Sequence, residues 1–581
     1  MSNNQQNETH AHKWGYKDTH MVLQADRSVK MTGDRYELSG LEMPEFVPFL
    51  EEMLEIRIDP ADIKVEQAEK PVAEPVVNEA FCRAIQQAFP ATQYTLDPQA
   101  RLIHSHGQAT GDEIYRILYT KLERSADLIF YCETEADAIQ LINLAKAHNV
   151  CLVPYGGGTS VSSALKLPAH EKRMIVSVDM RRMNQIEWID KENLRACVQA
   201  GITGSELEAQ LAKVGFVCGH EPDSIELSTL GGWIATNASG MKKNRYGNIE
   251  DIVENVTLVT PMGVLQQVEA MPRVAMGMQP QKLLFGNEGN LGLITKAVIR
   301  IHPLPAVKQY GSIVFPNFKA GTEFLYELTR AGIAPASVRL VDNFQFRFGS
   351  ALRPRATFMK AAMNKLQKSY LLHVKQFDPY QLAAATIVME GAVDEVKYQA
   401  QQIYKLAQKY GGIAGGEGHG KRGYMLTYAI AYIRDFLLQY HVIGETFETT
   451  VPWSKIQTVC DAVARQVDEQ HLAYKLPGKP YISYRITQCY HSGVCIYFTF
   501  GFYVKGIEQP DEILRQIEHT LRQVIMDTGG SISHHHGVGK LRKDFMAQTL
   551  SPASIDLLKQ TKQAIDPQNI FGIRNNIFAE E

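Results

Sequence analysis

Apolar residues in this chain form short runs that alternate with stretches of helical spacing. The clearest group is the apolar run 127–132, the helical pattern 135–148 and the apolar run 151–154, which predict a strand, a helix and a second strand. A helix that connects two strands is typical of an α/β domain. Further strands are predicted at 174–178, 185–189, 196–200, 253–260 and 297–301.

A second group of alternating patterns follows the proline-rich residues 302–305, where we expect a domain boundary. It predicts a second α/β domain, with strands at 311–315, 386–391 and 494–502 and helices at 396–410 and 511–527. The first 75 residues show no comparable pattern, so we expect an irregular arm there, followed by a helix at 77–89.

Composition narrows the class of protein. A chain of 581 residues is longer than one hydrophobic core usually serves, so two or more domains are expected. The formal net charge is −3, and without a basic excess no nucleic-acid partner is expected. The eight cysteines form no C-x-x-C pair, which disfavours a cysteine zinc site and a disulfide framework.

The chain ends and the most apolar region bear on targeting. Residues 1–12 are polar, so we expect no signal peptide. The apolar region 424–440 contains Arg434 and Asp435 and is too short to span a bilayer, although contact with a membrane surface stays open. Residues 578–581 do not form a peroxisomal signal.

A glycine-rich loop follows the predicted strand 151–154 at once. Gly156, Gly157 and Gly158 leave main-chain N–H groups free of side-chain obstruction, and such a loop can hold an anion. The hydroxyl groups of Thr159 and Ser160 add two donors, and a pyrophosphate would suit the loop. A tight turn without a ligand explains the same pattern.

A second glycine motif is formed by Gly418, Gly420 and Gly423, which fit G-x-G-x-x-G. No clear strand precedes it, and the acidic residues Asp435 and Glu445 do not end an obvious second strand. Both features are needed for a nicotinamide dinucleotide site, so none is expected here.

Two further segments, 221–240 and 286–292, are rich in small residues. Such a main chain can lie close to a flat ring system, and close packing of a helix on a sheet is the alternative explanation. The second segment precedes the predicted strand 297–301.

Eight motifs in a fixed order carry a resemblance to known families. GGGTS, GHEPDS, STLGGW and GNEGNLG resemble the PCMH-type FAD-binding domain of the vanillyl-alcohol-oxidase superfamily. GMKKNRYGNIED, APASVRLVDN, TYAIAYIRD and SHHHGVGKLRK resemble the alkylglycerone-phosphate synthase family, over residues 14–576. The implied α/β (α+β) fold has an N-terminal arm and helical region (1–121), a PCMH-type FAD-binding domain (122–304), a substrate-binding cap domain (305–530) and a C-terminal segment that returns a histidine triplet to the flavin site (531–581).

The resemblance implies FAD as a non-covalently bound cofactor, and His220 as the histidine of the flavin site. The implied FAD-binding residues are Pro154, Tyr155, Gly156, Gly157, Gly158, Thr159, Ser160, Asp223, Ser224, Ile225, Glu226, Leu227, Ser228, Thr229, Thr236, Asn237, Ala238, Ser239, Glu288, Gly289, Asn290, Leu291, Gly292, Leu293 and Ile294.

The implied reaction is redox-neutral. It exchanges the acyl chain of a 1-acylglycerone 3-phosphate for a long-chain fatty alcohol, which forms the ether bond of ether lipids. In the family's chemistry a carbanion beside the ketone adds to flavin N5, the carboxylate leaves, and the alcohol attacks the same carbon. A homodimer and peripheral membrane contact are further expectations from the family.

Three residues match the family's active-site residues in the second domain. Tyr497 lies in a predicted strand and needs a lowered pKa to transfer a proton near neutral pH, whereas a half-buried structural tyrosine is the alternative. Arg434 matches the substrate-binding arginine, and its partner is either a substrate phosphate or a carboxylate such as Asp435. Arg339, in an otherwise apolar strand, matches an arginine that is important for activity.

His534, His535 and His536 match the family's histidine triplet. In an extended backbone the first and third side chains share one face. The triplet can relay protons or bind a phosphate when charged. A metal site is the rival explanation, and no nearby cysteine or acidic cluster completes it.

The chain departs from the eukaryotic family members in having no N-terminal peroxisomal signal. We therefore expect a cytoplasmic protein if the source is bacterial and a peroxisomal one if it is eukaryotic. The alternative function is that of an FAD-dependent 2-hydroxy-acid dehydrogenase or oxidase. A non-catalytic flavoprotein is a third hypothesis, disfavoured because Tyr497 and the histidines are present.

Overall fold

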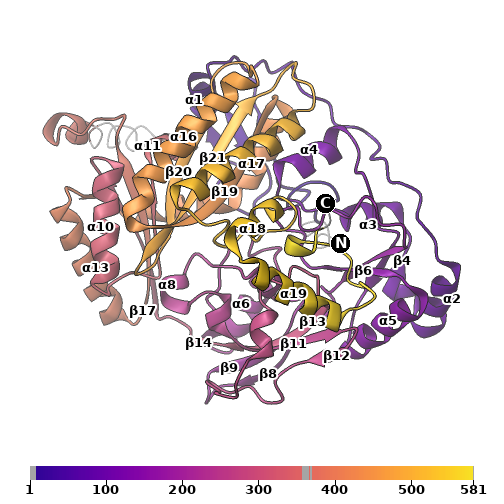
Figure 1. The fold of residues 1–581 in the computed structure, drawn as a ribbon. Helices are drawn as coiled ribbons and strands as arrows, with labels where there is room; N and C mark the ends of the chain where they lie inside the picture. The colour runs from indigo at the N-terminus through magenta and orange to yellow at the C-terminus, as the bar shows by residue number, and fades with distance from the viewer. Residues whose placement is uncertain (1–7, 356–365, 367–368, 580–581) are drawn as a thin grey trace. The chain divides into compact units, whose positions relative to one another are not determined.

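The computed structural model describes residues 8–355, 366 and 369–579. Residues 1–7 and 580–581, which enter the statements above on the chain ends, lie outside this range. Figure 1 shows the helices and strands. No helix among the described residues is long and apolar enough to cross a membrane. The mixed α/β class predicted from the sequence is confirmed.

The chain forms two compact units, and each is discontinuous in sequence. Unit 1 contains Trp14–Val65 and Pro305–Ser531 with a short N-terminal piece. Unit 2 contains Glu66–Leu304 and everything from Ile532 onward, together with Ala11–Lys13.

Unit 2 contains the predicted strand–helix–strand group. Its four-stranded sheet has the order β4-β5-β7-β6. The strands β5 (Leu128–Tyr131), β7 (Ile175–Asp179) and β6 (Cys151–Tyr155) are parallel, and the short β4 (Tyr94–Thr95) pairs antiparallel with β5. Helix α5 (Glu135–His148) connects β5 to β6 and begins at a capping box formed by Thr134 and Asp137. All five residues of β7 are buried, which explains the continuous apolar run in its sequence.

The second sheet of unit 2 is antiparallel, with the order β12-β11-β13-β9-β8. Its strands are β8 (Ile186–Asp190), β9 (Arg195–Gln199), β11 (Val253–Thr260), β12 (Gly263–Leu265) and β13 (Leu293–Arg300). Strand β13 begins four residues earlier than predicted, because Leu293 already pairs with Val259 of β11. Because Thr295 and Lys296 are polar, the hydrophobic pattern did not predict this first half of the strand.

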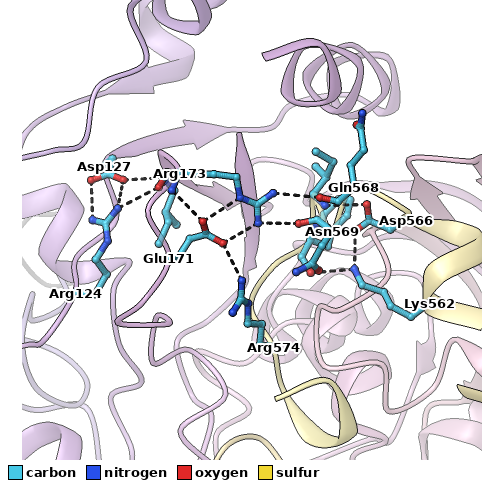
Figure 2. A network of polar contacts seen from close by, with 12 residues as sticks. Arg124, Asp127, Glu171, Arg173, Lys562, Asp566, Gln568, Asn569 and Arg574 are labelled. Atoms are coloured by element: carbon cyan, nitrogen blue, oxygen red, sulfur yellow. Dashed lines mark hydrogen bonds and ion pairs between the residues drawn. The ribbon is translucent and has the colours of Figure 1, made fainter. Parts of the chain in front are cut away.

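The C-terminal segment is part of the core of unit 2. Ile570 and Phe571 are fully buried among residues of α2 (Glu79–Ala88), α5 and the parallel strands. Figure 2 shows the polar contacts that hold the segment there. The Asp566 carboxylate accepts from the main-chain N–H groups of Ile570 and Phe571, each at 2.8 Å, and from Lys562 of α19 (Pro552–Ile565).

Glu171 continues this network. Its carboxylate pairs with Arg173 at 2.7 Å and with Arg574 at 3.4 Å, and Arg173 also donates to the carbonyl of Asn569 (Figure 2). Buried carboxylates with guanidinium partners fix the chain in one geometry, since each lost partner leaves a desolvated charge.

Unit 1 is built on a seven-stranded sheet of order β18-β15-β17-β16-β20-β21-β19. The strands are β15 (Val307–Phe315), β16 (Ser337–Val341), β17 (Ala383–Gly391), β18 (Ile413–Ala414), β19 (Val442–Pro452), β20 (Tyr481–Cys489) and β21 (Gly493–Tyr503). The predicted strands and helices of this region are present, and the paired strands are antiparallel.

One face of this sheet is apolar and is covered by helices of the described chain. It carries Leu340, Phe447, Phe498 and Phe502, and β21 alternates between this face and the other. The covering helices are α10 (Phe318–Arg330), α13 (Val393–Lys409), α16 (Ile456–Ala473) and α17 (Pro510–Thr528). Contacts include Gly321 of α10 against Leu340 and the stacking of His471 of α16 on Phe502.

The expectation of an irregular N-terminal arm was wrong. The arm contains β1 (Met21–Leu23), β2 (Val29–Met31), β3 (Glu42–Met43) and α1 (Phe46–Leu54). Buried residues of these elements form a cluster with Ile433 and Phe436 of α15 (Ile430–Gln439). The strands are two or three residues long, too short for a period-two pattern to emerge from the sequence.

The glycines of the second motif lie in helix α14 (Glu417–Met425), where no strand-to-helix phosphate turn is formed. We expect Gly418→Ala to raise the free energy of unfolding by about 0.5–1 kcal/mol, because a Cβ there meets open space on a helix. Gly420→Ala is expected to lower it by about 1–3 kcal/mol, because the Cβ would overlap the Gly311 carbonyl of β15. Urea denaturation of both variants checks this, and equal effects would contradict the placement.

A buried carboxyl group predicts a pH-dependent stability. Asp342 is 4% exposed and caps α11 (Asn343–Ala351) by accepting from the Gln345 N–H. Burial raises its pKa to about 7, against the two hydrogen bonds that lower it. The folded state therefore retains a proton between about pH 4 and 7 that the unfolded state has lost, so stability falls as pH rises through this window.

We expect Asp342→Asn to remove this fall, because asparagine caps a helix without ionising. Relative to the parent chain, the variant gains stability between pH 5 and pH 8 in thermal denaturation. Asp97→Asn, at an exposed helix cap with the same kind of hydrogen bond to Ala100, is the matched control. If the difference in stability between Asp342→Asn and the parent chain does not change with pH, ionisation of Asp342 is not the cause.

Candidate functional site

The glycine loop of unit 2 lies against the second implied flavin segment. A Cβ on Gly157 would overlap the Leu227 carbonyl, and one on Gly156 would lie 2.5 Å from Thr229 Oγ1. Gly158 has a φ of +70°, which favours glycine. Within the described chain, the main-chain N–H groups of 156–159 donate no hydrogen bond, so they are available to an anion.

The second implied segment is a compact turn that leads into helix α7 (Leu230–Thr236). Ser228 N–H donates to the Ser224 carbonyl, and the Trp233 indole N–H donates to Ser228 Oγ at 2.8 Å. Thr229 caps the helix by accepting from Gly232, and Asn237 ends it in the left-handed conformation. The implied residues from Asp223 to Ser239 therefore form one local structure beside the glycine loop.

His220 is buried, and neither ring nitrogen has a hydrogen-bond partner within the described chain. Its ring lies 4.6 Å from that of Trp233. Burial, with a smaller contribution from His535, lowers its pKa to about 3, so the imidazole is neutral near pH 7. A buried imidazole whose two nitrogens have no partner among the described residues is suited to bind a polar group of a ligand.

The third implied segment contains Glu288, whose side chain faces the loop after the histidine triplet. Its carboxylate accepts from the N–H groups of Val538 at 2.6 Å and Gly539 at 3.0 Å, and from Asn576 Nδ2 at 3.1 Å. Glu288 has a φ of +48°, which costs a non-glycine residue about 1–2 kcal/mol. The carboxylate contacts offset this cost, so Glu288 acts here as an anchor for the histidine loop.

The histidine triplet lies in a bend and not in a strand. His534 Nδ1 is 2.8 Å from His535 Nδ1, and the rings of His535 and His536 are 4.7 Å apart. Consecutive rings therefore contact each other, unlike the alternation of an extended backbone. Glycines at 537 and 539, both with positive φ, permit the bend.

The loop is also tied to the glycine-loop side of unit 2. Lys540 N–H donates to the Ser162 carbonyl at 3.0 Å, and its ammonium donates to Asn575 Oδ1 at 2.7 Å. Burial lowers the Lys540 pKa to about 7, opposed by the nearby carboxylates of Glu113 and Glu288. Asn575 in turn donates to the carbonyls of Ala164 and Glu288.

These features fit FAD. The free N–H groups of the glycine loop suit a pyrophosphate, and the unsatisfied imidazole of His220 suits a polar ring edge. The residues that would hold the cofactor are those of the glycine loop, the turn 223–229 and the start of α7, with His220 beside them.

In unit 1 the strand register places four polar residues on one sheet face, opposite the apolar face, and two of them were predicted from the sequence. Arg485 of β20 pairs with Tyr497 of β21, and Tyr497 pairs with Glu448 of β19. Val341 of β16 pairs with Arg485, so Arg339, two residues earlier, shares the same face. All four polar side chains are less than 10% exposed.

Each predicted residue of this face has a polar contact. Tyr497 donates from its hydroxyl to Thr446 Oγ1 at 3.0 Å. Arg339 donates to Thr427 Oγ1 at 2.7 Å, and its guanidinium lies 5.5 Å from the Tyr424 ring centroid. Arg485 and Glu448 were not predicted, and the signal that could have found them is the charge at an inward position of an otherwise apolar strand.

Arg434 lies on helix α15 and not on the sheet. Its guanidinium donates to Asp435 Oδ1 from Nε at 3.0 Å and from Nη2 at 2.6 Å. The carboxylate partner considered from the sequence is thus present. A substrate phosphate would have to compete with this carboxylate for the guanidinium.

Comparison with known proteins identifies the family. Residues 126–269 match the family described as FAD binding domain, and residues 304–574 match the family described as FAD linked oxidases, C-terminal domain. The chain is 41% identical to the alkyldihydroxyacetonephosphate synthase of Caenorhabditis elegans, over 97% of this chain and 94% of that protein. The chain belongs to the alkyldihydroxyacetonephosphate synthase family.

A solved alkyldihydroxyacetonephosphate synthase is similar in structure, with a TM-score of 0.84, 28% identity and coverage of 97% of each chain. The solved p-cresol methylhydroxylase shares the fold alone, with a TM-score of 0.62 and 14% identity over 85% of this chain and 96% of that one. Membership of the alkyldihydroxyacetonephosphate synthase family and the match to the FAD-binding family establish FAD as the cofactor.

Proposed function

We propose that the chain is an FAD-dependent transferase that exchanges the acyl chain of a 1-acylglycerone 3-phosphate for a long-chain fatty alcohol. The observation that carries the proposal is the 41% identity to a named alkyldihydroxyacetonephosphate synthase along nearly the whole chain. Residues suited to each part of the reaction are present. Unit 2 contains residues that fit FAD, and unit 1 carries guanidinium groups and the Tyr497 phenol on one buried sheet face.

When bound, FAD supplies an electron sink for the substrate carbon beside the ketone. Tyr497 is proposed to move the proton of that carbon, because its hydroxyl lies on the polar face of the sheet. Arg339 and Arg434 supply guanidinium groups that suit a phosphate, and Arg434 would exchange part of its pairing with Asp435 for it. His220 stays neutral and can donate or accept one hydrogen bond.

The test is an anaerobic exchange reaction with the purified flavoprotein. Palmitoyl-glycerone phosphate and radiolabelled hexadecanol are expected to give labelled alkylglycerone phosphate and free palmitate with no net bleaching of the flavin. Bleaching by a 2-hydroxy acid, with no exchange, would instead identify an FAD-dependent dehydrogenase or oxidase.

Non-covalent FAD, a homodimer and contact with a membrane surface belong to the same proposal. Acid precipitation is expected to release the flavin into solution, sedimentation to give twice the chain mass, and flotation with vesicles to recover the protein. The proposed location is cytoplasmic if the source is bacterial and peroxisomal if it is eukaryotic. Cell fractionation tests this.

A further inference from the structure

Arg485 lies directly over the phenol ring of Tyr497. The carbon at the centre of its guanidinium is 4.0 Å from the ring centroid, and the two residues are a direct pair across β20 and β21. Directly paired side chains in an antiparallel sheet point to the same face at close range. The stacking is therefore fixed by the sheet register and does not depend on a flexible loop.

The pair is shielded from solvent. Arg485 is 8% exposed and Tyr497 is 9% exposed, so the charge of the guanidinium is weakly screened at the ring. A cation over an aromatic face is attracted to its π-electrons, and the attraction grows when the phenol becomes a phenolate.

We propose that Arg485 is a positioning residue that holds the Tyr497 ring and favours its phenolate form. The inference rests on the proposed function, in which Tyr497 transfers a proton near neutral pH. The sequence indicates that Tyr497 needs a lowered pKa but does not show what lowers it. The guanidinium of Arg485 is a local cause of that kind.

Other charged groups around Tyr497 in unit 1 decide the balance. Glu448 of β19 is fully buried, pairs with Tyr497 on the opposite side from Arg485, and disfavours a phenolate. Arg339 of β16 adds a second cation to the face, one strand beyond Arg485. Arg434 and Asp435 of α15 are paired with each other, and Arg522 of α17 lies over Phe447 on the apolar face. Arg485 thus supplies a cation in direct contact with the ring, and it opposes Glu448.

The geometry also fixes the direction of the phenol. The hydroxyl group donates to Thr446 on β19, while the ring face lies under the guanidinium from β20. Two neighbouring strands therefore hold Tyr497 from two sides. Loss of the guanidinium removes both the charge and one of these two contacts.

The experiment is a titration of Tyr497 in the holoenzyme by nuclear magnetic resonance with tyrosine labelled at the ring carbon that bears the hydroxyl. Tyr497→Phe assigns the signal by its loss. The titration of this signal in the parent chain is the reference for the variants. In Arg485→Met the signal is expected to titrate at least about one pH unit higher, a tenfold smaller phenolate fraction at a fixed pH.

Two further variants separate charge from folding. Arg485→Lys keeps the charge and is expected to keep most of the lowered titration, which covers the case in which Arg485→Met does not fold. Arg330→Met removes the matched guanidinium that lies 4.2 Å from the Tyr326 ring in the same unit, and it should leave the Tyr497 signal unchanged.

In the pH–rate profile of the exchange reaction, the acidic limb reports the deprotonation of Tyr497. In Arg485→Met this limb is expected to move to higher pH, together with the titration of the Tyr497 signal. An unchanged Tyr497 titration in Arg485→Met, or an equal shift in Arg330→Met, overturns the inference. If the parent chain shows no exchange, the proposed function fails, while the titration still decides whether Arg485 stabilises the phenolate.

Discussion

Gly157→Ala is expected to abolish FAD binding. A Cβ at this position would overlap the Leu227 carbonyl and lie 2.6 Å from the Leu227 carbonyl carbon, and both atoms belong to the main chain. Main chain in the turn 223–229 cannot move aside cheaply, because Ser228 is fixed by its hydrogen bonds to Ser224 and Trp233. The glycine loop must therefore leave its place, and the N–H groups that face an anion go with it.

The measurement is the flavin absorbance per chain after purification, followed by titration of the stripped protein with FAD. We expect less than about a tenth of the parent flavin content, since a main-chain overlap costs several kcal/mol and each 1.4 kcal/mol is a tenfold loss of affinity. Gly349→Ala, in helix α11 of unit 1, is the control, because its Cβ would make an ordinary contact of 3.6 Å with Leu426 Cδ1 and lies outside the residues that would hold FAD. Parent-like FAD affinity in Gly157→Ala would refute the loop's role.

Tyr497→Phe is expected to lower the rate of exchange by about 10²–10⁴-fold, the usual contribution of a positioned proton-transfer group. The ring stays between its neighbours, so the packing against Arg485 and the fold of the sheet are retained. FAD content should be unchanged, because the residues that fit the cofactor lie in unit 2. The loss should therefore appear in kcat, with a small effect on KM.

Tyr484→Phe is the control for this second substitution. Tyr484 lies on β20 next to Arg485, and it pairs with Phe498 on the apolar face of the sheet. Removing its hydroxyl should leave the exchange rate within about twofold of the parent, as expected of a residue that makes no contact with the reacting atoms. Comparable losses in both variants would mean that the effect of Tyr497 is structural.

The local parts of the structure were predictable from the sequence. The strand–helix–strand group at 127–154 and the glycine loop depend on neighbouring residues, and hydrophobic spacing records such neighbours directly. The motif order pointed to FAD and to His220, although only burial shows that both imidazole nitrogens lack partners.

Long-range pairings could not be predicted in this way. Glu288 and Val538 are 250 positions apart, and nothing in either local pattern records their hydrogen bond. The partner of Tyr497 depends on the register of β20 and β21, which contains an irregularity between Ile486 and Gln488. A shift of one residue would turn Arg485 to the apolar face, and no rule of spacing excludes that shift.

The discontinuity of unit 2 has a consequence for the order in which the protein is made. A ribosome completes β5, β6 and β7 early, but the residues that close their core, Ile570 and Phe571, emerge only after the whole of 305–531. During that interval the nascent unit 2 exposes an apolar edge, while the sheet of unit 1 can already pair its strands. We therefore expect cofactor loading to be a late step of biogenesis, so that a nascent chain arrested before residue 562 depends on a holding chaperone and carries no flavin.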